Sequence, residues 1–119
     1  MATNTAYTNA QSNANGVVNN AHGYVTYPAT AITAADSSVF DIGFKPRYVR
    51  WENITDRTAI EWFEGMADNT CIKTVAAGTR TLETTNGGIT VSSSGFSVLQ
   101  NATLAAILAS KVCAFRASA

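Results

Sequence analysis

The sequence predicts an all-β fold: a jelly-roll-like two-sheet β-sandwich with one short helix and an extended N-terminal arm. Three observations support this. Short segments rich in β-branched and aromatic residues alternate with turn clusters, and no long stretch has the 3.6-residue period of an amphipathic helix. The first charged side chain is Asp36, so the 119-residue chain opens on a long uncharged run. Eight or nine strands in one small domain favour two stacked sheets, because stacking protects exposed strand edges.

The arm is assigned to residues 1–21 and the β-sandwich domain to residues 22–119. The opening run, MATNTAYTNAQSNANGVVNN, contains too little apolar surface to offset its ordering entropy alone. We therefore expect neighbouring copies, or another protein beneath it, to hold the arm. The candidate assembly contacts in the arm are Ala2, Thr3, Asn4, Thr5 and Tyr7.

Nine segments have the composition of strands, and Pro28 and Pro46 fall between them, as expected for residues that cannot donate to a ladder. The expected strands are His22–Tyr27, Ser38–Gly43, Arg47–Ile54, Thr58–Glu64, Thr70–Val75, Thr79–Thr84, Gly88–Ser92, Phe96–Leu99 and Lys111–Arg116.

Two connections look tight. Ile54–Thr58 separates two aromatic-bearing strands by a few polar residues, which suits a hairpin. Thr85–Gly88 supplies residues that tolerate positive φ, and a hairpin turn accounts for its Gly-Gly pair. A phosphate-binding glycine loop is therefore not indicated.

The strands on either side of the first turn should form the densest part of the core. Val49 and Trp51 share one face of the first strand, and Ile60 and Trp62 share one face of the second. Burial of both tryptophans is favoured over a sugar-binding platform.

One segment, Asn101–Ala109, departs from the strand pattern. It has a capping Asn followed by Leu104, Ile107 and Leu108 at i, i+3, i+4 spacing, which predicts a two-turn helix. Because so short a helix is marginal alone, its apolar stripe must pack on a sheet or on a neighbour.

Composition excludes several function classes. Eight acidic and eight basic residues cancel, so we expect no nucleic acid partner, which would require a basic stripe. There is no apolar run long enough for a membrane span and no secretory signal pattern, so we expect a soluble product made in the cytoplasm. Cys71 and Cys113 each lie in an apolar strand-like run and are interpreted as free buried thiols rather than a disulfide pair.

The residues do not indicate an enzyme, a metal site or a cofactor. His22 is the single histidine, and we interpret it as a polar residue at a strand start. Glu61 and Glu64 bracket two aromatics, but residues three apart in a strand point to opposite faces, so they should not form a catalytic pair.

Four further residues are candidates for contacts with a partner. Tyr48 is the aromatic most suited to exposure, because it lies between arginines. Arg47, Arg50 and Arg57 are either ordinary surface charges or residues that bind the carboxylates of a neighbouring protein through their guanidinium groups. The sequence leaves both possibilities open.

The segments FDIGFKPRYVRWENITD (Phe40–Asp56) and EWFEGM (Glu61–Met66) resemble small virion proteins of tailed bacteriophages. Ala77–Thr81 and Gly88–Val91, followed by Gly95 and Phe96, extend this resemblance over about half of the chain. The shared motifs are structural: a Gly-Phe-x-Pro turn, an Asn-x-Thr-Asp hairpin and a Glu-Trp-x-x-Gly-Met strand end.

The resemblance implies a capsid decoration or cement protein, a β-rich domain without a catalytic site that sits on the head, often as a trimer. Its expected partners are the major capsid protein and further copies of itself, and its expected location is the capsid surface of the virion. The alternatives are a tail or fibre component, or a carbohydrate-binding module that recognises a host surface.

Overall fold

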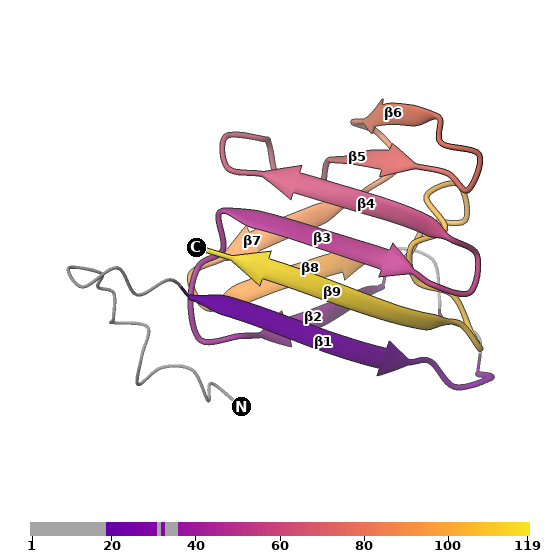
Figure 1. Cartoon of the computed structure of the whole chain (residues 1–119), viewed down its shortest axis with the longest axis horizontal. Helices are drawn as coiled ribbons and strands as arrows, with labels where there is room; N and C mark the ends of the chain where they lie inside the picture. The colour runs from indigo at the N-terminus through magenta and orange to yellow at the C-terminus, as the bar shows by residue number, and fades with distance from the viewer. Residues whose placement is uncertain (1–18, 31, 33–35) are drawn as a thin grey trace.

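The computed structural model describes residues 19–30, 32 and 36–119, and these form an antiparallel β-sandwich. The candidate arm contacts Ala2, Thr3, Asn4, Thr5 and Tyr7 lie outside the described residues. Figure 1 shows the two sheets as two layers, with the C-terminal strand of the chain lying between the first and the third strands in the larger one.

The larger sheet has six strands in the order β1-β9-β3-β4-β5-β6. Every neighbouring pair is antiparallel. The strands are β1 (Asn20–Thr26), β9 (Val112–Ser118), β3 (Tyr48–Asn53), β4 (Thr58–Phe63), β5 (Cys71–Thr74) and β6 (Arg80–Glu83).

The smaller sheet has three strands in the order β2-β8-β7. These are β2 (Ser37–Asp41), β8 (Gly95–Leu99) and β7 (Ile89–Ser92). All nine strands predicted from the sequence are confirmed, with boundaries that differ by at most two residues. β1 begins at Asn20, so Asn20 and Ala21 belong to the sheet, where they pair with Ser118 and Ala117 of β9.

The core lies between the sheets and is built from the residues that alternate inward along β3 and β4. Val49, Trp51 and Ile60 are fully buried, and Trp62 is 5% exposed, as the alternation predicts. Trp51 joins an aromatic cluster in which ring centroids lie 5.1 to 6.1 Å apart, with Phe40, Phe96 and Phe115 as the other members.

The predicted helix over Asn101–Ala109 does not form. The Asn101 side chain does accept from the backbone N–H groups of Thr103 and Leu104, at 2.8 and 3.2 Å, as a cap would. A single turn then closes from the Ala105 N–H to the Asn101 carbonyl, and Ala105 adopts φ 56°, which ends it. The segment is a series of turns whose Leu104 and Ile107 are fully buried, so the expected packing of the apolar stripe is confirmed.

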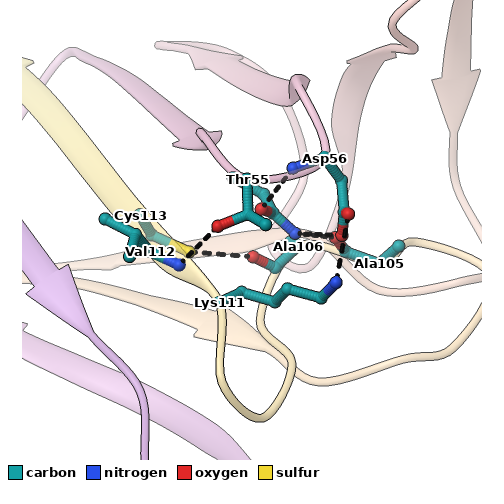
Figure 2. A network of polar contacts seen from close by, with 8 residues as sticks. Thr55, Asp56, Ala105, Ala106, Lys111, Val112 and Cys113 are labelled. Carbon is teal, nitrogen blue, oxygen red and sulfur yellow. Dashed lines mark hydrogen bonds and ion pairs between the residues drawn. The ribbon is translucent and has the colours of Figure 1, made fainter.

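Buried side chains of the large sheet bind the carbonyls of this segment, and Figure 2 shows the contact of the Cys113 thiol with the Ala106 carbonyl. Trp51 Nε1 donates to the Ala106 carbonyl at 2.9 Å, and Asn53 Nδ2 donates to the Ala105 carbonyl at 3.3 Å. In a helix over residues 101–109 the Ala105 carbonyl would accept a bond from the Ala109 N–H, whereas the Ala106 carbonyl would be one of the last four, which have no partner within the helix. Side chains of the large sheet therefore replace one helical bond and satisfy one carbonyl that a helix would leave open.

A second correction concerns Thr85–Gly88. Gly87 has φ 85°, as the sequence suggests, but the turn is not a hairpin, because β6 and β7 belong to different sheets. Gly88 is packed so closely that a Cβ there would lie 2.4 Å from the Thr70 backbone. The Gly-Gly pair lets the chain cross between the layers. Among the described residues there is no helix long and apolar enough to cross a membrane.

The two cysteines are free and buried. Desolvation by burial raises the pKa of Cys71 to about 12 and that of Cys113 to about 11. The interpretation of both as small buried hydrophobic residues is confirmed.

Candidate interaction surface

The outer face of the six-stranded sheet gathers the polar and aromatic side chains that alternate with the core residues. Arg50, in the middle of β3, is paired with Glu61 on β4 and with Arg116 on β9. Directly paired residues share a face. One row of side chains across the sheet therefore contains two arginines and one glutamate.

Glu61 is the centre of this face. Its carboxylate accepts a hydrogen bond from the Tyr48 hydroxyl at 2.6 Å and forms ion pairs with Arg50 at 3.3 Å and Arg80 at 2.8 Å. Its side chain is only 14% exposed. Desolvation raises the pKa of Glu61, but the Tyr48 hydrogen bond and the charges of Arg50 and Arg80 outweigh it, so the pKa lies below its ordinary value.

Tyr48 is fixed from two sides. Its hydroxyl is bound to Glu61, and its ring lies against that of Phe63, with centroids 5.1 Å apart. Burial raises the pKa of the Tyr48 phenol, and the hydrogen bond to the Glu61 carboxylate raises it further. Tyr48 is therefore a neutral, oriented donor at neutral pH rather than a base.

Arg116 lies opposite Arg50 without a carboxylate of its own. It is exposed, and within the described part of the chain it forms no ion pair, whereas Arg50 reaches Glu61 and Glu52. Like charges directly opposite each other in a sheet are destabilising. A shallow depression of about 160 Å³ lies at the same place, lined by Arg50, Glu52, Ala114, Phe115 and Arg116. It is smaller than a usual small-molecule pocket of roughly 300 Å³ or more.

Large apolar side chains surround the charged row. Tyr24 on β1 is 73% exposed, Leu82 on β6 is 63% exposed and Phe63 on β4 is 43% exposed. Strand register places all three on the same face as Arg50. The face thus combines exposed aromatic and aliphatic groups with arginines, a composition that is enriched in protein interfaces.

The structure brings together only some of the candidate residues. Tyr48 and Arg50 share the Glu61 cluster. Arg47 lies beside them and pairs with Glu64 at 2.9 Å, with both side chains well exposed. Arg57 lies in the β3–β4 turn, at the opposite end of that hairpin, with φ 58°.

Glu61 and Glu64 bind different arginines: Glu61 pairs with Arg50 and Arg80, and Glu64 pairs with Arg47. His22 is exposed on β1. The residues described by the structure include no group of three or more His, Cys, Asp or Glu side chains that could hold a metal ion.

The sequence reasoning missed Arg116, Arg80 and Tyr24 as members of this surface. Their place on this surface depends on which strands are neighbours in the sheet. For example, β9, from the C-terminal end of the chain, lies between β1 and β3. A period-2 pattern gives the face of each residue on its own strand, but not which strand lies beside it. The one sequence signal for this surface was Arg116 itself, a charged residue within an otherwise apolar strand-like segment.

Comparison with protein-family models, with curated protein sequences and with solved structures gives no match.

Proposed function

We propose that this protein is a structural virion component that decorates and stabilises a bacteriophage capsid, by bridging neighbouring major capsid subunits from the capsid surface. The observation that carries the proposal is the outer face of the six-stranded sheet, where the Arg50 and Arg116 pair lies among exposed Tyr24, Phe63 and Leu82. The resemblance of Phe40–Asp56 to tailed-phage virion proteins supports the same conclusion.

In this proposal a carboxylate of a capsid subunit enters the depression between Arg50 and Arg116. Guanidinium groups suit this role because they bind carboxylates in a bidentate geometry and lose less hydration than an ammonium group. Glu61 already orients Arg50 and Arg80, so less side-chain entropy is lost on binding. The apolar side chains around them then exclude water from the contact.

The N-terminal arm supplies a second attachment. An uncharged segment of about twenty residues that pairs with a partner gains backbone hydrogen bonds at the cost of conformational entropy. Two linked attachments convert weak contacts into strong ones through effective concentration. The arm and the sheet face would together attach each copy to the capsid, and many copies would stabilise the shell at the same time.

The topology is consistent with a divergent jelly roll. Winding a long β-hairpin into a sandwich places the first strand beside the last and the second beside the second-last. The pairs β1–β9 and β2–β8 follow that rule, whereas the sequential pairs β3–β4, β4–β5, β5–β6 and β7–β8 depart from it. We also propose that the protein acts as a homo-oligomer.

The test is attachment to heads that lack this protein. Purified wild-type protein should saturate such heads and raise the temperature at which they release their contents. Arg116→Glu should reduce attachment at least tenfold, because it places a carboxylate where the partner's carboxylate binds. Arg57→Glu changes the net charge equally at the far end of the hairpin and is the matched control, with a smaller expected loss.

Removal of residues 2–18 tests the arm and leaves β1 intact. The truncated protein should stay folded and fail to saturate the heads. If truncated protein and Arg116→Glu both attach like wild type, the decoration proposal is wrong.

A tail or fibre component, or a carbohydrate-binding module, is the second candidate. The Tyr48 and Phe63 rings form an aromatic pair at one end of the same face, and aromatic faces stack on sugars. Glycan-array binding that is lost in Phe63→Ala and Tyr48→Ala, together with a location at the tail, would favour this candidate over decoration.

A further inference from the structure

The first strand, β1, is an edge strand with an open side. Among the strands that the structure describes, β1 pairs only with β9, through a regular antiparallel register from Asn20↔Ser118 to Thr26↔Val112. No backbone hydrogen bond reaches residues 20–26 from another strand or loop in the described part of the chain.

The ladder fixes which backbone groups face that open side. Tyr27 N–H donates to the Lys111 carbonyl and Ala119 N–H donates to the Asn19 carbonyl, so 27↔111 and 19↔119 are hydrogen-bonded pairs. Such pairs recur at every second residue. The odd-numbered residues of β1 are therefore bonded to β9. The N–H and C=O groups that point away from β9 belong to Asn20, His22, Tyr24 and Thr26.

This edge lacks the features that normally block pairing between sheets. Natural edge strands are short or carry charges, prolines or bulges. β6 starts with Arg80 and ends with Glu83, β2 ends with Asp41, and β7 has four residues. β1 has seven residues, NAHGYVT, without a charge, a proline or an interruption of its register.

We propose that β1 pairs antiparallel with β1 of a second copy, about a two-fold axis at Gly23. In that register His22 of one copy lies opposite Tyr24 of the other, and Asn20 lies opposite Thr26. Every outward N–H and C=O of these residues then finds a partner. Registers centred one residue to either side leave some of these groups unpaired.

The side chains suit this contact. All four residues with outward backbone groups are exposed, and Tyr24 is 73% exposed. In the pair, the Tyr24 ring lies beside His22 of the other copy, and cross-strand contacts of this kind stabilise sheets. With no charge on β1, the two strands meet without like-charge repulsion. An isologous contact of this kind closes on itself and makes a continuous sheet of two copies.

The inference rests on the proposed function, because it specifies how copies of a capsid-bound protein contact one another. Its test uses the full chain alone, so the two can fail separately. Wild-type protein should sediment as a concentration-dependent dimer. A monomer at all concentrations up to the millimolar range would overturn the inference, even if the protein still attaches to heads.

Tyr24→Pro removes one outward N–H and leaves the bonds to β9 intact. Tyr24→Thr is the matched control, because it shortens the side chain and keeps the N–H. Tyr24→Pro should weaken dimerisation about tenfold or more relative to Tyr24→Thr. Equal dimerisation of the two variants would place the contact elsewhere and overturn the inference.

Amide exchange in wild-type protein gives a reading that does not depend on the fold of a variant. In the concentrated sample the amides of His22, Tyr24 and Thr26 should be protected, and dilution should expose them. The amides of Ala21, Gly23 and Val25, which bond to β9, should stay protected in both samples. Fast exchange of His22 and Tyr24 at high concentration contradicts the pairing.

Discussion

Trp51 on β3 donates its indole N–H to the carbonyl oxygen of Ala106 at a distance of 2.9 Å, across 55 positions of the sequence. This bond joins the centre of the large sheet to the segment 101–109, and the Cys113 thiol approaches the same carbonyl at 3.6 Å. The Trp51 ring also contacts the rings of Phe40 and Phe115, with centroid distances of 5.1 and 6.1 Å. One side chain thus connects both sheets and the longest irregular segment near the C-terminus.

Trp51→Phe should lower the free energy of unfolding by about 1–3 kcal/mol, because the buried Ala106 carbonyl loses its strong donor. Trp62→Phe is the matched control. The Trp62 indole bonds to Ala67 at 3.3 Å, five residues away, and the loss should be smaller. Urea denaturation followed by far-ultraviolet circular dichroism measures both, and an equal or reversed order would contradict the role given to Trp51.

Asn53→Ala should destabilise the domain by roughly 1–3 kcal/mol, since Asn53 is fully buried and serves two loops. Its amide donates to Asp56 and to the Ala105 carbonyl, and its oxygen accepts from the Asp56 N–H at 3.1 Å. Lys111→Met, which removes the partly exposed Lys111–Asp56 ion pair, should cost less than about 1 kcal/mol. The two denaturation midpoints should differ accordingly, and similar midpoints would show that the buried amide does not anchor the loops.

The Glu61 cluster predicts a specific pH dependence of stability. Because the folded-state pKa of Glu61 is lowered, its contribution is fully present above the unfolded-state value near 4.5 and is lost as the pH falls through the lowered pKa. Glu61→Gln should therefore be less stable than wild type at pH 7, and the difference should shrink as the pH falls below 4.5. Glu64→Gln, in an exposed pair, should show little difference at either pH. A constant difference for Glu61→Gln across this range would argue against a charge-based role.

The cysteines should be unreactive in the native state. Burial raises the pKa of Cys71 to about 12 and of Cys113 to about 11, so neither forms thiolate at pH 8. Ellman's reagent should label both thiols only in denaturant, and the mass should not change on reduction. Rapid labelling of native protein would indicate that the core around them opens.

Gly23→Ala should be strongly destabilising, although Gly23 is on an edge strand. A Cβ there would lie 2.0 Å from the Phe115 ring, and that ring packs on Phe40 and Phe96. Overpacking of this kind costs about 1–3 kcal/mol. The additional change Phe115→Leu should recover part of the loss in thermal denaturation. If Gly23→Ala alone is as stable as wild type, the close approach of Phe115 to β1 is wrong.

The sequence predicts the strands but not their neighbours. β-branched and aromatic alternation is local, so Val49, Trp51, Ile60 and Trp62 were assigned to the core correctly. Arg50 and Arg116 are opposite each other only because β9 inserts between β1 and β3, which no local pattern encodes. The helix prediction failed because i, i+3, i+4 spacing of apolar residues also occurs in a buried series of turns. Here Trp51 and Asn53 bind carbonyls of the segment, so it does not need helical hydrogen bonds.

A density map of the decorated particle tests the central claim most directly. The account predicts copies across the whole head, with the outer face of the six-stranded sheet against a capsid subunit and an acidic side chain between Arg50 and Arg116. A map in which the three-stranded sheet faces the shell and Arg116 points into solvent would contradict it.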